Sequence, residues 1–192
     1  MWRNREGEEC DEWQQFQGER TIKYWFDGFI DREELGNLSD LVITPARINE
    51  LTEGSLDIIC SHLGLINVDL ELAVMLSGAS PRQTRNNFIK VYSLLLRGLE
   101  SIKEDYDIVL IDCPPNFNIV TKNALVASDY YLVPAKPDFL STLGIAQLNR
   151  HVDELTSNYN VYARQYDDEV EPVNPDLMGI IFTMVGIRNN NI

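Results

Sequence analysis

The sequence has no Cys-X-X-Cys pair, and its three cysteines, Cys10, Cys60 and Cys113, are scattered. The two histidines, His62 and His151, also lie far apart in the chain. Zinc sites and disulfide frameworks are marked by short ligand spacings and by an even cysteine count, and neither is present. We therefore expect reduced thiols in a cytoplasmic protein, with no structural metal.

Long apolar runs are missing as well. No run approaches the ~18–20 residues that span a bilayer, so no membrane association is evident. The first ten residues, MWRNREGEEC, have no apolar stretch behind their two arginines, and we do not expect a secretory signal. Apolar residues make up 44% of the chain and charged residues 24%, which is typical of a globular protein. The 192 residues suit one domain with a sizeable core.

Basic residues are few, since 16 lysines and arginines stand against 30 acidic residues and give a net charge of −14. Nucleic-acid binding usually needs a basic patch that neutralises phosphates. The basic residues are dispersed, apart from a loose group on one predicted helix: Arg82, Arg85, Lys90 and Arg97. Taken alone, the composition argues against strong DNA binding but leaves room for a small local patch.

A phosphate-binding glycine loop is also missing. None of the 11 glycines is followed by lysine, and no two glycines are adjacent. A P-loop needs closely spaced glycines whose N–H groups converge on phosphate, followed by a lysine and a hydroxyl residue. The sequence therefore contains no recognisable P-loop.

The chain does contain alternating strand and helix patterns. Residues 1–50 mix polar and aromatic residues and predict a helical N-terminal segment, with these packing residues: Trp13, Phe16, Tyr24, Trp25 and Phe26. Buried strands are predicted at 56–61, 107–112, 130–135 and 177–185, and helices at 67–78, 83–104, 117–128 and 140–158. Asn67 is the expected cap of the first of these helices, and Gly78 its expected end. Strands alternating with helices indicate parallel crossover units, so we predict an α/β fold with a doubly wound, mostly parallel sheet and helices on both faces.

One helix and one loop carry further expectations. The helix at 83–104 has a single apolar side, made of Phe88, Val91, Tyr92, Leu95, Leu99 and Ile102. The acidic run at 166–176 contains two prolines and is predicted to be a solvated loop.

A carboxylate stands at the end of the 107–112 strand. In open parallel sheets, ligands bind outside the carboxyl ends of the strands. Asp112 falls at that end, directly before Pro114 and Pro115, which stop the strand and fix the backbone. A lone aspartate at such a position is often structural, and a binding role needs support from its surroundings.

Those surroundings resemble a known family. The stretch YDIVLIDCPPNFNIVTKNALVASDYYLVPAKPDFLSTLGIAQL resembles the Walker B region of ParA-type partition ATPases, which are related to MinD. The matching elements are Tyr106-Asp107, Asp112 to Pro115, Thr121, Asn123 to Leu125, Ala127 to Asp129, Pro134, Leu140-Ser141 and Gly144. The stretches LMGIIFTMVGIR and SLDIICSHLGLINVDLELA resemble flanking parts of the same family, so the resemblance covers roughly residues 52–188. Bacterial tyrosine kinases and iron–sulfur carrier ATPases fit less well, because they usually lack Cys-Pro-Pro with a downstream Asn-Ala-Leu.

The resemblance implies a P-loop NTPase fold for residues 51–192 and a set of site residues. Asp112 would hold the shell of a magnesium ion through water and would be needed for ATP hydrolysis. Cys113, Pro114, Pro115 and Asn116 would form the switch that senses the γ-phosphate. Thr183 and Met184 match positions near the adenine, and Arg188 matches an arginine that follows the same strand and completes the nucleotide-binding set. Gly186 stands where an aspartate is common. Plain structural roles remain open for each of them, and Cys113 is expected to be a packed turn residue rather than a reactive thiol.

The family's P-loop and the strand that follows it would precede these elements, and residues 1–50 show neither. We expect the chain to be cut at both ends, with a degenerate protein that has lost hydrolysis as the alternative. By the resemblance, the missing first strand lies beside the Asp112 strand, so its absence would leave backbone groups unpaired, each costing ~1–3 kcal/mol.

The resemblance also implies partners for the intact protein: a homodimer that sandwiches ATP, non-specific DNA, and a centromere-binding protein that stimulates hydrolysis. Two function hypotheses follow. The first is a partition ATPase represented here without its phosphate cradle, and the second is a non-hydrolytic interaction module derived from the ParA/MinD family. A MinD-like membrane-positioning ATPase is a third possibility, which would need an amphipathic C-terminal tail.

Overall fold

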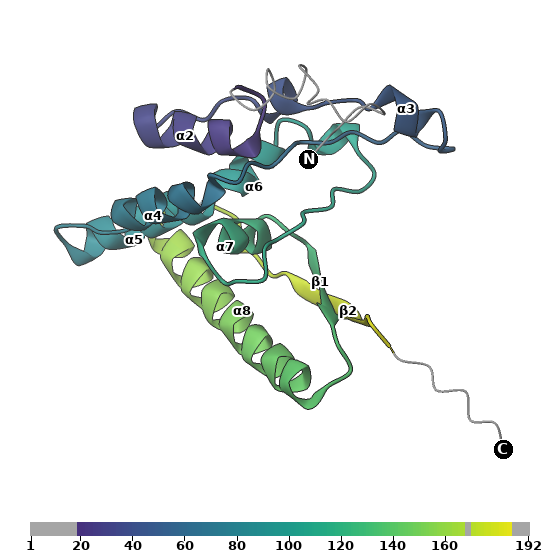
Figure 1. Ribbon diagram of the computed structural model, residues 1–192. Coiled ribbons are helices and arrows are strands. Elements are labelled where there is room, and N and C mark those ends of the chain that lie inside the picture. The colour runs from purple at the N-terminus through teal and green to yellow at the C-terminus, as the bar shows by residue number, and fades with distance from the viewer. Residues whose placement is uncertain (1–18, 168–169, 186–192) are drawn as a thin grey trace.

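The computed structural model describes residues 19–167 and 170–185 of the chain, and Figure 1 shows their arrangement. Helices and strands alternate in the second half, as the sequence predicts. In chain order the elements are α2 (Ile22–Arg32), the short helix η1 (Leu38–Leu41), α3 (Ala46–Asn49), α4 (Leu65–Met75), α5 (Pro81–Tyr92), α6 (Leu94–Leu99), η2 (Lys103–Asp105), α7 (Ile119–Val126), β1 (Tyr130–Ala135), α8 (Phe139–Tyr166) and β2 (Asp176–Phe182). None of the helices in the described ranges is long and apolar enough to cross a membrane.

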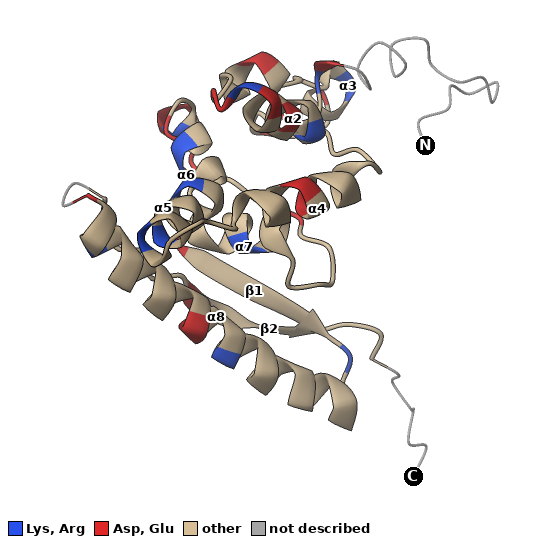
Figure 2. Ribbon diagram, turned by 90° about the vertical axis from the view of Figure 1, so that its left-hand side faces the viewer, with Lys and Arg blue, Asp and Glu red and all other residues tan. Residues whose placement is uncertain are grey.

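β1 and β2 pair in parallel, and α8 connects them as a crossover helix, as Figure 2 shows. The predicted strands at 130–135 and 177–185 and the parallel α/β arrangement are therefore confirmed. Alternate β1 residues are half-buried toward α8, where the hydroxyl of Tyr131 donates to Asn149 Oδ1 over 3.2 Å. The opposite side chains, Tyr130 and Leu132, are exposed. A doubly wound sheet is not confirmed, because the described residues form two strands with a helix packed on one face.

The strand predicted at 107–112 is wrong. The chain there runs without a ladder partner among the described residues, and Ile108 and Leu110 are 76% and 91% exposed. The nearly continuous apolar run is typical of a strand with neighbours on both edges and cover on both faces. The described residues supply neither, so the pattern has nothing to pair with.

The strand predicted at 56–61 is also wrong as a continuous element. Two isolated bridges replace it: Ile58 pairs antiparallel with Ile43, and Cys60 pairs parallel with Thr21. Their backbone bonds are 2.9 Å long and point to different partner segments. The 56–61 segment therefore bonds to the loop at Ile43 and to the N-terminus of α2, and it does not join a sheet.

The helix predicted at 83–104 breaks into α5 and α6 at Ser93. In an unbroken helix the N–H of Leu95 would donate to the carbonyl of Val91. The side-chain amide of Asn123, on α7, takes both places: its Oδ1 accepts from Leu95 N at 3.2 Å and its Nδ2 donates to Val91 O at 2.9 Å. A side chain inserted into the helical ladder is an established cause of a helix break.

α4 also differs from the prediction at both ends. It begins at Leu65 after Gly64, so Asn67 lies inside the helix and is not its cap, and it ends at Met75 before Gly78 is reached. Gly78 instead lies against the start of α5, where an added Cβ would come within 2.6 Å of Thr84 N.

Apolar residues occupy both sides of α4. Val68 and Leu72 on its inner side are fully buried, whereas Ile66, Leu70 and Val74 form an exposed row at i, i+4 and i+8.

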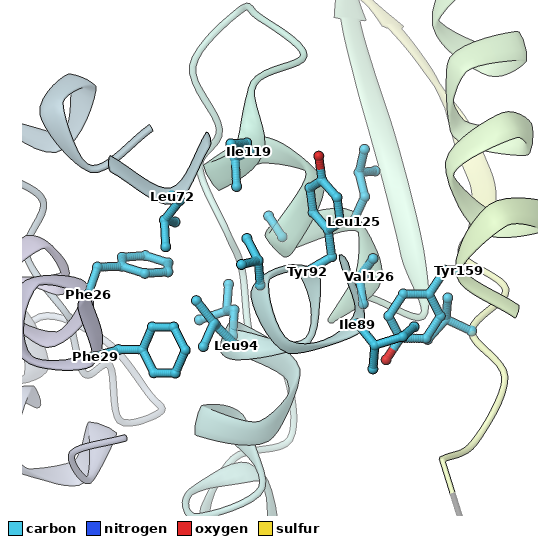
Figure 3. Packing of buried hydrophobic residues seen from close by; sticks show 14 of the residues in the cluster. Phe26, Phe29, Leu72, Ile89, Tyr92, Leu94, Ile119, Leu125, Val126 and Tyr159 are labelled. Atoms are coloured by element: carbon cyan, nitrogen blue, oxygen red, sulfur yellow. The ribbon is translucent and has the colours of Figure 1, made fainter. Parts of the chain in front are cut away.

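One hydrophobic core joins the helices, as Figure 3 shows. Phe26 and Phe29 from α2 face Leu72 from α4 and Leu94 from α6, and Tyr159 from α8 closes the far side. Four members of the predicted apolar side of 83–104 are buried, and the other two, Phe88 and Leu99, pack against the core while partly exposed.

The aromatic residues predicted to pack in the N-terminal segment differ in their burial. Trp25 and Phe26 are buried as predicted, and Trp25 Nε1 donates to Gly36 O. Tyr24 is exposed, which corrects that prediction, and Trp13 and Phe16 lie outside the described residues. The division of the chain near residue 50 stays a prediction.

Candidate functional site

Asp112 lies at the end of the extended 107–112 segment and is exposed. The segment is fixed at its start, where the hydroxyl of Tyr106 donates to Asp57 over 2.8 Å. That bond raises the pKa of Tyr106 to about 12. The pKa of Asp57 is lowered, mainly by a hydrogen bond from Thr44 and secondly by the bond from Tyr106. Within the described ranges, no hydrogen bond or ion pair is made by the Asp112 carboxylate, so it is free to bind a ligand from solution.

The loop from Cys113 to Asn118 follows and is mostly exposed. Asn116 N donates to Pro114 O over 2.7 Å, which closes a tight turn centred on Pro115. Asn116 Oδ1 in turn accepts from Asn118 N at 3.2 Å and from Thr121 Oγ1 at 3.3 Å. The predicted switch residues therefore form one compact loop whose far end is bonded to α7.

The Cys113 side chain sits at the start of this loop. Cys113 is exposed, yet the surrounding protein desolvates its thiol enough to raise the thiol pKa. The charge of Asp112 raises that pKa further. A raised pKa lowers the thiolate fraction at neutral pH and with it the reactivity. The expectation that Cys113 is a packed turn residue rather than a reactive thiol stays a prediction.

Two aromatic contacts hold the loop's last apolar residue, Phe117. Its ring centroid lies 5.3 Å from that of His151, on α8, and the ammonium of Lys122 lies 5.3 Å from the same ring. Lys122 also lies 5.8 Å from the ring of Tyr92. Burial lowers the pKa of Lys122, and the charges of Glu154 and Asp69 oppose that change.

Sequence reasoning missed Asp69, which lies on α4. Its carboxylate accepts from Val120 N at 2.9 Å and from Asn118 Nδ2 at 3.4 Å. No spacing in the sequence connects an aspartate with residues fifty positions later, so only the tertiary structure identifies it.

The residues predicted to lie near the adenine are at the other end of the chain's described part. Thr183 N donates to Ala135 O over 2.8 Å, so Thr183 extends the β1–β2 pairing at the carboxyl end of both strands. Met184 is exposed and has a left-handed φ of 57°. Among the described residues, no hydrogen bond or ion pair joins either residue to Asp112 or its loop. Gly186 and Arg188 lie outside the described residues.

An open groove of about 390 Å³ lies between the carboxyl half of β1 and the first turns of α8. Its lining is mainly apolar, with Lys136 and Ser141 as polar members, and Gly144 on its α8 wall. Neither Asp112 nor Thr183 lines it, so the groove and the predicted site residues are separate features.

The fit of these residues to a magnesium–nucleotide complex is partial. Magnesium usually takes one or two protein carboxylates and fills its other positions with water and phosphate oxygens, so the exposed Asp112 meets the protein's share. No group of three or more acidic, histidine or cysteine residues in the described ranges could hold a metal by itself. The triphosphate is not provided for, because the sequence has no glycine followed by lysine. We derive no hydrolytic step through ATP for these 192 residues.

The comparisons with known proteins agree with the resemblance. The family model described as AAA domain, AAA_31, matches residues 19–163. Sporulation initiation inhibitor protein Soj of Bacillus subtilis is 30% identical over 157 residues, covering 79% of this chain and 51% of Soj. Chromosome partitioning protein ParA of Caulobacter vibrioides is 29% identical over 137 residues, covering 70% of this chain and 42% of that protein.

This chain thus spans about half the length of the curated relatives that it matches. No solved structure matches. Because the family model covers about three quarters of the sequence, the chain belongs to the AAA_31 family of AAA domains and is a member of the ParA-type ATPase family.

Proposed function

We propose that this chain acts in DNA partitioning as the magnesium-binding and adenine-binding part of a ParA-like ATP site. Asp112 holds the metal shell, and the loop from Cys113 to Asn116 responds to the γ-phosphate. Thr183 and Met184 lie at the adenine, and Arg188 belongs to the nucleotide-binding residues. The observation that carries the proposal is the free, exposed carboxylate of Asp112, which only Cys113 separates from the bonded turn of Pro114 to Asn116.

The phosphate cradle must come from polypeptide that is not among these 192 residues. The unpaired 107–112 segment supports this, because Ile108, Val109 and Leu110 are exposed and the backbone has no ladder partner in the described ranges. When bound, Mg–ATP supplies the reactive phosphoryl group, while the chain's own residues orient the metal and the base. The name of the Caulobacter relative, chromosome partitioning protein ParA, supports a role in chromosome partitioning.

The intact assembly is proposed to be a homodimer that binds DNA non-specifically and responds to a centromere-binding partner. The charge of −14 makes any DNA contact local. The basic residues of the predicted group lie on two helices, α5 and α6, because the helix breaks between Lys90 and Arg97.

A non-hydrolytic interaction module is the second candidate, and the absence of a glycine–lysine pair favours it. The two candidates are separated by supplying the missing segment. The chain is co-expressed with a polypeptide that carries the first strand, phosphate loop and second strand of a ParA-type relative, and ATP turnover of the purified complex is measured with magnesium.

Restored turnover that falls at least about tenfold in Asp112→Asn and is kept in the control Asp107→Asn supports the ATPase. Asp107 is exposed and lies at the other end of the same segment. A stable complex without turnover supports the interaction module. The 192-residue chain alone is expected to show no tight ATP binding by calorimetry, and tight binding there would contradict our account of the missing cradle.

A further inference from the structure

Helix α7 begins without a cap from its own segment. The first N–H groups of a helix have no partner within the helix, and an acidic or polar side chain usually accepts from them. Asn118 occupies the capping position, but its side chain makes no cap bond to α7.

Asp69 of α4 supplies the acceptor instead. One carboxylate oxygen accepts from Val120 N at 2.9 Å, and the other accepts from Asn118 Nδ2 at 3.4 Å. A negative charge at this end of a helix is also favoured by the helix dipole.

The same contacts reach the loop after Asp112. Asn118, which donates its amide to Asp69, donates its backbone N–H to Asn116 Oδ1 at 3.2 Å. Asn116 also accepts from Thr121, in the first turn of the helix that Asp69 caps. A continuous series of hydrogen bonds therefore runs from α4, through Asp69 and Asn118, to the centre of the loop.

We propose that Asp69 is a positioning residue that fixes the loop from Cys113 to Asn118 beside Asp112. The proposal rests on the proposed function, since the loop matters only if it lies at a nucleotide site. Asp69 touches neither metal nor nucleotide in this role. Because it belongs to α4, a shift of that helix would move the far end of the loop, which makes α4 the element through which the loop can be controlled.

Cys113 provides a local probe, because it lies at the opposite end of the loop from the contacts with Asp69. In a chain with Cys10→Ser and Cys60→Ser, the rate of alkylation by iodoacetamide reports on Cys113 alone. A second chain with Cys10→Ser and Cys113→Ser reports on Cys60, which is held by the separate bridge to α2's N-terminal residues.

Asp69→Ala is expected to raise the Cys113 rate by more than twofold and at most about fivefold, because a typical cap changes a local opening equilibrium about fivefold and the exposed Cys113 already reacts in part in the closed loop. The Cys60 rate should stay within about twofold. Glu71→Ala is the matched control, because Glu71 is an exposed acid on the same helix, and it should leave both rates unchanged. Asp69→Asn keeps an oxygen for Val120 N and should give an intermediate Cys113 rate.

Equal acceleration at Cys113 and Cys60 would show general loosening and overturn the proposal, as would no acceleration or the same effect from Glu71→Ala. If Asp69→Ala does not fold, Asp69→Asn decides alone: an intermediate rise confined to Cys113 supports the proposal, and a wild-type rate overturns it. The measurement needs no nucleotide, so a failure of the proposed function would leave its result intact. In the complex with the supplied phosphate loop, Asp69→Asn should lower turnover while Glu71→Ala does not.

Discussion

Replacement of Asn123 by alanine should destabilise the fold far more than loss of an ordinary asparagine. Asn123 is completely buried, and its amide makes three hydrogen bonds, two of them to the backbone groups left open at the break between α5 and α6. Alanine leaves Leu95 N–H and Val91 C=O without their partner, and each unsatisfied buried group costs ~1–3 kcal/mol. Partial closure of the helix would let these two groups bond directly and recover some of that cost, so we expect a loss of ~2–4 kcal/mol.

Urea unfolding followed by circular dichroism measures this loss. With a slope of about 2 kcal/mol per molar urea, the midpoint should fall by ~1–2 M at an unchanged slope. Asn87→Ala is the control, because Asn87 lies on α5 and donates to Ser77 O over 2.7 Å at an exposed position. That variant should lose less than ~1 kcal/mol. If both variants had the same midpoint, the amide would not be what maintains the break, and our account of the two helices would be refuted.

Two further predictions concern packing and pH. Gly98→Ala should lower the melting temperature and cost ~1–3 kcal/mol of stability, because the added Cβ would lie 2.6 Å from Trp25 Cζ2 in the core. Gly144→Ala is the control: an added Cβ meets no atom within 4 Å there, and the variant should stabilise α8 by ~0.5–1 kcal/mol. Equal melting temperatures for the two variants would contradict the close contact at Gly98. Tyr106→Phe removes a hydrogen bond that lowers the pKa of Asp57 in the folded state. A carboxyl group with a lowered folded-state pKa stabilises the fold at pH values above its unfolded pKa of about 3.9. That contribution is lost as the pH falls through the lowered folded-state pKa. The stability gap between wild type and Tyr106→Phe should therefore be constant near neutral pH and shrink below about pH 4, with the exposed Tyr24→Phe as control; a gap that does not change with acid would exclude the Asp57 bond as its cause.

The sequence predicts the elements whose partners are close in the chain. β1, α8 and β2 form a single crossover unit, and their apolar periods are sufficient to locate them, although α8 continues to Tyr166, beyond the predicted end at 158. The buried side of the 83–104 helix follows from its period as well, because that side depends on local spacing.

The errors concern features that depend on distant residues. The apolar run at 107–112 indicates a central strand, but its pairing needs strands that the described residues do not contain. The break at Ser93 is caused by Asn123, thirty residues later, and the cap of α7 comes from Asp69 on α4. The position of Asp112 at a ligand-accessible end could be predicted from the prolines after it, whereas the bonds that fix its loop could not.

The exposed row of Ile66, Leu70 and Val74 on α4 has a consequence for how the protein behaves in solution. A charge of −14 makes molecules of this protein repel one another at low ionic strength, while the exposed apolar row favours contact between them. Added salt shortens the range of the repulsion to ~3 Å at 1 M and leaves the hydrophobic attraction in place. Self-association should therefore increase with ionic strength, and dilute buffers will keep the protein dispersed.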